Sequence, residues 1–386
     1  MDLILGAESI KFPLTGIGRY ALELANGLRR QPEVKSLHFL VGGAIQSDVL
    51  TKDLQAQEKA RAEAAIAFRR NLMGFKPLLA AYRGLKEVRQ AWALRPYRGA
   101  IYHGPNYYLP LHDGPSIATF HDLSIFKHPE FHPQARVQFM TNELPRALKR
   151  ADLLLTDSNY TRDEVIAYSG FSAERVLAIP LAASGEFRPR SDVECSEIQL
   201  QLDLRYQSYT LYAGTIEPRK NLCALLDAYE GLAYELRHRV PLVVAGYRGW
   251  RSDDIHSRLL RAQSEGWARY LDYVAAEHLP VLFSGARAFA FPSIYEGFGL
   301  PVLEAMASGV PVVCSNATSL TEVAGNCALM CDPEDVLGLR QLIERAIEDD
   351  SWRQSAISNG LAHAASFSWA KTVRMTMEAY RLAASF

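Results

Sequence analysis

The sequence has no long hydrophobic run and no paired cysteines. Among its 386 residues, no apolar stretch reaches the roughly 20 residues that a membrane-spanning helix requires. Its five cysteines form no C-x-x-C pair and mostly have apolar neighbours, which argues against a disulfide framework and favours a reduced, cytoplasmic chain. The apolar start from Met1 to Leu5 ends at Gly6-Ala7-Glu8, too early for the core of a signal peptide, so we expect a first strand there.

The sequence also lacks an excess of charge of one sign. Lysine and arginine number 42 and the acids 43, so the net charge of −1 gives no support to a nucleic acid as the main ligand. Between Glu58 and Arg98, however, ten basic residues stand against three acids and are interleaved with aromatic and aliphatic side chains. Such a basic amphipathic segment fits two interpretations, the face of an anionic membrane or an ordinary solvated pair of helices.

What the sequence has in abundance is short apolar runs that alternate with helical patterns. We expect helices at 19–30, 134–150 and 161–168, among others. We expect strands at 3–7, 37–41, 100–103, 116–121, 152–157, 176–180, 209–214, 241–246, 270–274, 288–292, 310–314 and 328–331. This alternation predicts an α/β fold with two parallel sheets, because the length also exceeds one ordinary core.

One segment with little periodicity divides the chain. Residues 179–191 contain two prolines and a glycine, which is typical of a linker between domains. We therefore assign 1–183 to an N-terminal domain and 184–367 to a C-terminal domain. The last segment, from Ser368 onward, is one amphipathic helix, and its pattern alone does not fix the domain on which it packs.

The stretch from Phe291 to Gly309 joins a strand, a glycine loop and a helix around two carboxylates. Gly297 and Gly299 permit a turn whose backbone lies close to a ligand, at the carboxyl end of a parallel strand, where open α/β sheets bind their ligands. Glu304 stands among apolar residues and would need a polar partner such as sugar or ribose hydroxyls. The alternative is that Glu296 and Glu304 form the acid and base pair of a glycosidase.

Two cations open a helix after the strand that ends at Gly214. Arg219 and Lys220 have the wrong sign for a helix N-terminus, which makes sense if an anionic group such as a diphosphate lies between them and the helix. A solvated basic turn is the alternative. The pair Gly16 and Gly18, after the first strand, is a weaker signal of the same kind because the full G-x-G-x-x-G pattern is missing.

Polar residues at other strand ends have both structural and functional interpretations. His103 and His121-Asp122 each stand where a strand is expected to stop, and either interpretation fits them. Asp157-Ser158-Asn159 is typical of a helix cap, and Ser319 to Glu322 of a capping box with no catalytic part. The polar loop 246–250 is a further candidate for contact with a ligand.

Together these segments strongly resemble the retaining glycosyltransferases of family 4. The resemblance spans almost the whole chain and rests on Gly16 to Tyr20, His121-Asp122, Gly214 to Asn221, Gly246, and the Glu-x7-Glu element from Glu296 to Glu304. It implies the GT-B fold, in which two Rossmann-like domains with parallel sheets face a central cleft. The donor is then held mainly by the C-terminal domain and the acceptor by the N-terminal one. In that fold the last helix, 368–386, packs back on the N-terminal domain.

The resemblance also implies a donor site. Arg219 and Lys220 would bind the diphosphate of a nucleotide sugar and neutralise the departing nucleoside diphosphate, so neither a metal nor a cofactor is expected. Glu304 would hold the ribose hydroxyls, Glu296 and the amides after it the transferred sugar, and Val274 would lie near the base. The implied donor-binding set is Gly16, Gly18, Gly214, Arg219, Lys220, Val274, Glu296, Gly297, Phe298, Gly299, Leu300 and Glu304.

A second set of implied residues belongs to the chemistry and the acceptor. His121 would touch the sugar or its oxocarbenium-like transition state, beside Glu296, Lys220 and Arg219 in the catalytic group. His103, Asn106 and Asp122 are assigned to the acceptor. The reaction is expected to retain anomeric configuration by front-face attack, in which a donor phosphate oxygen takes the acceptor proton.

The N-terminal motifs look most like bacterial enzymes that build O-antigen or other surface polysaccharides. This likeness implies a mannosyl or rhamnosyl group, a GDP-sugar donor, a lipid-linked or glycan acceptor, and a place at the inner face of the cytoplasmic membrane through 58–98. Two rivals stay open. One is a nucleotide-sugar epimerase of the same fold, and the other is a non-catalytic scaffold that binds a nucleotide sugar.

Overall fold

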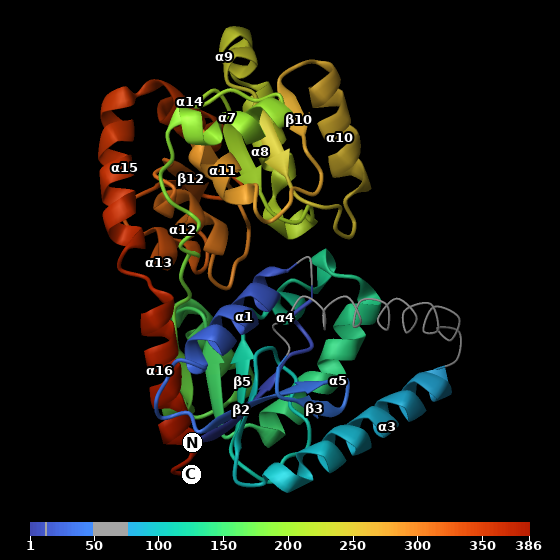
Figure 1. Ribbon diagram of the computed structural model, residues 1–386. Helices are drawn as coiled ribbons and strands as arrows, with labels where there is room; N and C mark the ends of the chain where they lie inside the picture. Colours follow the sequence, from blue (N-terminus) through green and yellow to red (C-terminus); the bar gives the residue numbers. More distant parts are fainter. Residues whose placement is uncertain (12–13, 49–75) are drawn as a thin grey trace.

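The chain folds into two α/β domains stacked one above the other (Figure 1). The computed structural model describes residues 1–11, 14–48 and 76–386, with the backbone alone for 76–83. Residues 58–75 of the basic segment predicted to meet a membrane therefore fall outside the described residues. Two domains, each with its own parallel sheet, confirm the predicted α/β architecture.

The N-terminal domain is built on a seven-stranded sheet in the order β3-β2-β1-β4-β5-β6-β7. Its pairings are parallel except that of β2 with β3, a short edge strand that the sequence pattern did not indicate. The strands are β1 (Asp2–Gly6), β2 (Ser36–Val41), β3 (Ala44–Gln46), β4 (Ile101–Gly104), β5 (Ser116–Phe120), β6 (Leu153–Thr156) and β7 (Val176–Ala178). The helices are α1 (Gly16–Leu28), α3 (Lys76–Leu94), α4 (Ser124–Lys127), α5 (Gln134–Arg150) and α6 (Asn159–Ser169), with 3-10 turns η1 (Arg95–Tyr97), η2 (Pro129–Phe131) and η3 (Ala173–Arg175).

The C-terminal domain has a six-stranded parallel sheet in the order β10-β9-β8-β11-β12-β13. Its strands are β8 (Thr210–Ala213), β9 (Leu242–Ala245), β10 (Ala268–Tyr270), β11 (Ala288–Phe291), β12 (Val312–Ser315) and β13 (Leu329–Cys331). The helices are α7 (Asp192–Gln201), α8 (Leu222–Glu230), α9 (Tyr234–Arg239), α10 (Asp253–Ser264), α11 (Leu279–Ser284), α12 (Leu300–Ala307), α13 (Leu320–Ala324), α14 (Val336–Glu348) and α15 (Asp350–Ala364), with one 3-10 turn, η4 (Pro218–Lys220). The strand β10 ends at Tyr270, where the pattern had predicted its start, so Val274 lies in the loop that follows.

The last helix, α16 (Trp369–Ala383), leaves the C-terminal domain below α15 and runs along the N-terminal domain (Figure 1). It packs against α1 and β5. The Thr372 hydroxyl donates to the carbonyl of Pro180 at 2.7 Å, and Arg381 pairs with Glu33 at 2.6 Å. The chain therefore crosses between the domains twice, once through the linker and once before α16.

Candidate active site

The loops at the carboxyl ends of the two sheets meet between the domains. Gly297, in the loop after β11, lies directly against the turn after β5, and a Cβ added at Gly297 would stand 1.7 Å from the carbonyl oxygen of His121. The hydroxyls of Ser158 and Thr161, at the start of α6, donate to the Gly297 carbonyl at 2.7 and 3.0 Å. Only glycine fits between these two backbones. The sequence predicted that the backbone of this loop lies close to a ligand, whereas here it lies close to the backbone of the other domain.

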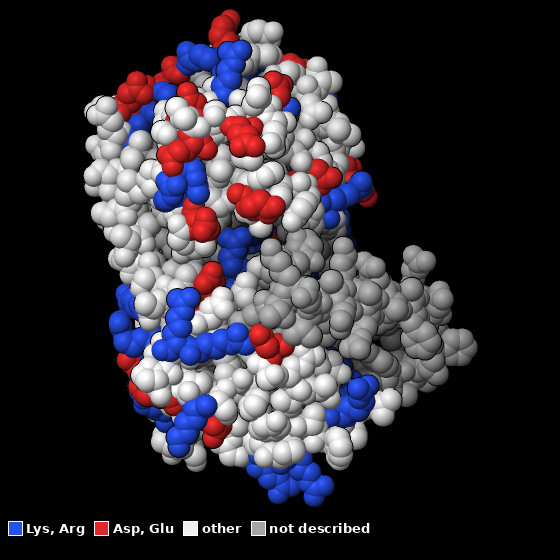
Figure 2. Space-filling view, viewed as in Figure 1, with Lys and Arg blue, Asp and Glu red and all other residues white. Residues whose placement is uncertain are grey.

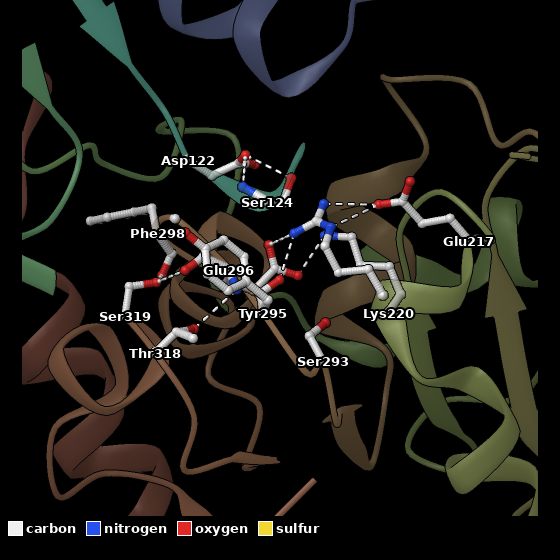
Figure 3. A network of polar contacts seen from close by, with 12 residues as sticks. Asp122, Ser124, Glu217, Lys220, Ser293, Tyr295, Glu296, Phe298, Thr318 and Ser319 are labelled. Carbon is white, nitrogen blue, oxygen red and sulfur yellow. Dashed lines mark hydrogen bonds and ion pairs between the residues drawn. The ribbon is translucent and has the colours of Figure 1, made fainter. Parts of the chain in front are cut away.

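Glu296 is the centre of a buried ionic cluster in the C-terminal domain (Figure 3). Its carboxylate accepts from the Lys220 ammonium at 2.5 Å and from the Arg219 guanidinium at 3.2 Å. Its backbone N–H donates to the Thr318 hydroxyl at 3.0 Å, which fixes the loop. Burial raises the pKa of Glu296, but the charges of Lys220 and Arg219 outweigh burial, so the net pKa is below its usual value.

Arg219 holds several loops together at once. Its guanidinium donates to Glu217 at 2.8 Å and to the Tyr295 carbonyl at 2.5 Å, besides Glu296. Burial lowers the pKa of Arg219, but the carboxylates of Glu296, Asp122 and Glu217 raise it by a larger amount. The net pKa is above its usual value, so this side chain stays charged. The two cations predicted to bind a diphosphate are thus matched here by carboxylates, with Asp122 contributed from the other domain.

Glu304 has a partner that the sequence did not indicate. Its carboxylate lies on α12, is only 5% exposed, and pairs with Arg19 of α1 across the domain boundary at 2.8 Å. Burial raises the pKa of Glu304 to about 7, although Arg19 acts in the opposite direction. The prediction that a buried acid needs a partner was right in principle, but the partner in this arrangement is a cation of the N-terminal domain.

His121 lies at the end of β5 with both ring nitrogens engaged. Nδ1 contacts the Asp157 carboxylate at 2.7 Å, and Nε2 contacts the Pro105 carbonyl at 2.8 Å. The Pro105 carbonyl can only accept, so Nε2 carries a hydrogen, while Nδ1 and Asp157 share a proton between them. Burial lowers the pKa of His121, but Asp157 and the hydrogen bonds raise it above its usual value. The raised pKa favours the cationic form of the ring.

The structure corrects the acceptor role predicted for His103. This side chain is 2% exposed, and its two nitrogens contact the hydroxyls of Tyr380 on α16 and Thr119 on β5, both at 2.8 Å. Burial lowers the pKa of His103 to about 3, with the charge of His121 acting in the same direction. His103 is therefore a neutral core residue that ties α16 to the sheet, because its ring is buried and both nitrogens are bonded within the core.

The other two residues predicted for the acceptor lie near the site. Asp122 accepts from the backbone N–H and hydroxyl of Ser124 at 2.9 and 2.8 Å. Burial raises its pKa, but Arg219 and Ser124 lower it more, so Asp122 is ionised. Asn106 lies in the loop after β4, and its side-chain oxygen is buried without a hydrogen-bond partner among the described residues.

The structure also shows where the remaining residues of the predicted donor site lie. Gly16 begins α1, three residues before the predicted start, because the Thr15 side chain caps the helix by accepting from Gly18 N–H at 3.2 Å. Gly299 precedes Leu300 with a φ of +102°, where a side chain would also meet Leu320. The Phe298 ring is buried against Phe367. Gly214 follows β8, and Val274 is half-buried beyond β10.

One prediction about a loop near the site was wrong. Ser319 does not form a capping box, because its hydroxyl donates to the carbonyls of Glu296 and Phe298 at 2.8 and 3.0 Å. Glu322 instead accepts from the backbone N–H of Asn159 at 2.9 Å, at the first turn of α6 in the other domain. The loop 246–250 also reaches that domain, where the Trp250 indole donates to the Phe131 carbonyl at 2.6 Å.

The predicted helix cap at Ser158 is confirmed, because its hydroxyl accepts from the Thr161 N–H at 3.1 Å. Within the described part of the chain, no three His, Cys, Asp or Glu side chains are placed to hold a metal ion. In the same residues, no helix is both long enough and apolar enough to cross a membrane.

Comparison with known proteins agrees with this geometry. Residues 14–183 match the family model "Glycosyltransferase Family 4", and residues 203–363 match "Glycosyl transferases group 1". The chain is 46% identical over 384 residues to O-antigen chain mannosyltransferase B of Escherichia coli, covering 99% of this chain and 100% of that protein. It is 34% identical over 275 residues to the serotype-specific mannosyltransferase WbdA of Escherichia coli, covering 69% of this chain and 33% of that protein.

Solved structures show the same fold at lower identity. HepE of Anabaena in complex with UDP and glucose aligns with a TM-score of 0.69 at 18% identity and 99% coverage of both chains. WaaG, a glycosyltransferase involved in lipopolysaccharide biosynthesis, aligns with a TM-score of 0.66 at 14% identity, covering 97% of this chain and 98% of that one. The two domains are therefore those of the GT-B fold, and this chain belongs to glycosyltransferase family 4, with bacterial O-antigen mannosyltransferases among its relatives.

Proposed function

We propose that this protein transfers a mannosyl group from GDP-mannose, with retention of configuration and without a metal, during assembly of a bacterial surface polysaccharide. The observation that carries the proposal is the buried cluster of Arg219, Lys220 and Glu296 at the carboxyl ends of β8 and β11. The choice of mannose is supported by the mannosyltransferase relatives, above all by the one that matches along its full length. The choice of GDP rests on the resemblance of the N-terminal motifs.

The donor can bind to this cluster by an exchange of ionic partners. Without a ligand, Arg219 and Lys220 are paired with Glu296. A diphosphate that replaced this carboxylate as their partner would keep both cations satisfied and would release Glu296 to accept from hydroxyls of the transferred sugar. The same two cations then neutralise charge on the leaving nucleoside diphosphate, which is the contribution that a metal ion makes in other enzymes.

The proton of the acceptor goes to a donor phosphate oxygen in this proposal. His121 is poorly placed to act as the base, because Nε2 donates to the Pro105 carbonyl and Nδ1 is bonded to Asp157. Asp122 is stabilised as an anion beside Arg219, so its affinity for a proton is low. The Nε2–H of His121 can instead donate to a hydroxyl oxygen of the sugar, after a change of its Pro105 contact.

A membrane-facing position is proposed for α3. Leu85, Val88 and Trp92 lie one helical turn apart on this helix and are 61, 65 and 76% exposed. Arg89 and Arg95 are exposed beside them. Figure 2 shows Lys and Arg side chains at the lower end of the molecule, where Figure 1 places the C-terminal end of α3. An exposed apolar stripe flanked by arginines fits an anionic bilayer, which supports a position at the cytoplasmic face of the membrane.

Product analysis with GDP-mannose that carries its label in the mannosyl group tests the catalytic proposal. The protein is incubated with a mannose-terminated oligosaccharide in the presence of EDTA, and the products are separated and examined by NMR. We expect an α-linked, elongated oligosaccharide and unlabelled GDP, since GDP-mannose is itself the α anomer. A β linkage, a requirement for metal, or isomerised donor without elongation would each contradict the proposal, and the last would indicate an epimerase.

A further inference from the structure

Tyr295 stands immediately before Glu296 in the loop after β11, and its side chain reaches the other domain. The ring is only 1% exposed. Its hydroxyl accepts from the backbone N–H of Leu123, in the turn after β5, at 3.2 Å and donates to the carboxylate of Glu164 on α6. Because both partners belong to the N-terminal domain, this one side chain crosses the domain boundary beside the buried ionic cluster.

The N-terminal domain offers this side chain a matching socket. Its walls are the rings of His128 and Tyr160, which lie edge-on to the Tyr295 ring with centroids 5.3 and 6.3 Å away. Edge-to-face contacts of this length are favourable between aromatic rings. The polar end of the socket consists of the Glu164 carboxylate, an acceptor, and the Leu123 N–H, a donor. We call these four residues of the N-terminal domain the tyrosine socket.

Glu164 is held in the tyrosine socket by its own domain. Its Oε1 accepts from the Tyr160 hydroxyl at 3.2 Å and lies 3.7 Å from the Lys127 ammonium, which leaves Oε2 for Tyr295. Burial raises the pKa of Tyr295, and the hydrogen bond to Glu164 raises it further, so the hydroxyl stays protonated and donates to the carboxylate. A buried phenol hydroxyl without a partner is unfavourable, so the tyrosine socket fixes the ring in one place.

The backbone of Tyr295 is fixed at the same time by the ionic cluster. Its carbonyl accepts from Arg219 at 2.5 Å. The next residue, Glu296, accepts from Arg219 at 3.2 Å and from Lys220 at 2.5 Å. One peptide bond therefore joins a side chain held in the N-terminal domain to the carboxylate that occupies both cations. Movement of Glu296 away from the cations turns this backbone and works against the contacts of the Tyr295 ring.

We propose that Tyr295 is a positioning residue that holds Glu296 on its two cations in the ligand-free enzyme, so that a nucleoside diphosphate binds only after the tyrosine has left its socket. The inference rests on the proposed glycosyl transfer, because the diphosphate is that of the donor. It accords with Gly297, whose backbone also lies against the N-terminal domain in the same loop. The observed affinity is then the intrinsic affinity multiplied by the fraction of molecules in which the tyrosine socket is empty.

Two variants break the contact from opposite sides. Tyr295→Phe removes the hydroxyl and keeps the ring, and Glu164→Ala removes its partner in the N-terminal domain. Binding of GDP is measured by calorimetry, and the melting temperature verifies folding. We expect GDP affinity to increase by about threefold or more in each variant, because more molecules have the tyrosine socket empty. Damage to the fold would weaken binding instead, so a gain in affinity separates this role from a purely structural one.

The double variant and a matched control sharpen the test. Since both substitutions break one contact, Tyr295→Phe combined with Glu164→Ala should bind GDP no more than about twofold more tightly than the better single variant. Tyr160→Phe removes the other hydroxyl bonded to Glu164, within α6 itself, and should leave GDP affinity unchanged. Hydrogen exchange at the Leu123 amide gives a readout without ligand. In Glu164→Ala the Tyr295 hydroxyl is still present, so faster exchange there shows that the ring has left the tyrosine socket.

Unchanged or weaker GDP binding in either single variant would overturn the inference, as would unchanged exchange at Leu123 in Glu164→Ala. The same holds if GDP binds neither to the unmodified protein nor to the variants. Failure of the proposed function would look different, because GDP would then bind more tightly to both single variants while GDP-mannose gave no elongated product with any of the proteins.

Discussion

Glu296 is the residue on which both cations of the site converge. It is ionised, buried and within 3.2 Å of Arg219 and 2.5 Å of Lys220. Arg219 also pairs with Glu217 at 2.8 Å. Such a cluster is costly to bury unless every charge is matched.

Removing a member of this cluster should affect turnover strongly. We expect Glu296→Ala and Lys220→Ala each to lower kcat at least a hundredfold, the order of magnitude for loss of one preorganised transition-state contact. Steady-state kinetics with GDP-mannose, combined with circular dichroism to verify folding, measures the effect. Near-normal turnover in either folded variant would mean that the donor does not react at this cluster.

Glu304 should make stability depend on pH. Its pKa is raised from 4.5 to about 7 in the folded protein. The folded state therefore holds this proton more tightly, and the contribution of Glu304 to stability is full below about pH 4.5 and is lost as pH rises through about 7. In Glu304→Gln that loss is absent. We expect the melting temperature of the variant, relative to the unmodified protein, to increase between pH 5 and pH 8.

The quantity to measure is the difference in melting temperature between Glu304→Gln and the unmodified protein, obtained by thermal unfolding at several pH values. His121, whose pKa is also raised, loses its own contribution as pH rises, but it does so equally in both proteins and cancels. A difference that stays constant from pH 5 to pH 8 would show that the pKa of Glu304 is not raised.

Among the elements, α3 has the surface least suited to water. Its stripe of Leu85, Val88 and Trp92 is exposed, whereas Lys86 on another face pairs with Glu8. Only this end of the basic segment predicted from the sequence lies within the described residues. The exposed stripe is the observation that favours the membrane interpretation over an ordinary solvated helix.

Vesicle sedimentation tests that choice. We expect the protein to sediment with phosphatidylglycerol vesicles at low salt, to be released by high salt, and to remain in solution with phosphatidylcholine. Leu85→Ser combined with Trp92→Ser should weaken binding about tenfold or more, since each removes apolar surface that would enter the bilayer. Leu260→Ser, at an exposed leucine of α10, is the control. Full solubility of the unmodified protein with anionic vesicles at low salt would contradict the proposal.

At the scale of the whole molecule, the domains are held together by contacts between side chains of both. Glu322 caps α6 of the other domain at Asn159, and Trp250 donates to Phe131. Arg19 and Glu304 form a further contact. Because Gly297 lies directly against the His121 backbone, a nucleotide sugar bound as proposed above would have to move these loops apart.

We expect the domains to separate when the contacts of Glu322 and Trp250 are weakened. Glu322→Ala combined with Trp250→Phe should increase the radius of gyration measured by small-angle X-ray scattering without ligand. The reason is that the covalent connections, the linker and the segment before α16, join the domains, whereas the closed arrangement depends on non-covalent contacts. Glu344→Ala, an exposed glutamate of α14, is the control and should leave the radius unchanged. An unchanged radius in the double variant would show that these contacts do not hold the closed arrangement.

Much of the architecture could be predicted because it depends on local patterns. Runs of alternating or continuous apolar residues marked the strands, and the proline-rich stretch at 179–191 separates β7 from α7. The edge strand β3 was missed because it is three residues long, and β10 was misplaced because Tyr270 ends the ladder rather than starting it. Such errors arise where pairing with a neighbour, not the local sequence, sets the limits of a strand.

The sequence by itself determined the chemistry of the site, since the cations at 219–220, the glycines beside Glu296 and the buried acid at 304 follow from residue type and spacing. Only the tertiary structure decided their partners. Arg19 reaches Glu304 from 285 residues away, and Glu322 caps a helix in the other domain rather than its own. His103 is a core residue because its Nδ1 bonds to the hydroxyl of Tyr380 on α16. A hydrogen bond or an ion pair depends on distance in space, and that distance exists only once both domains are folded and closed.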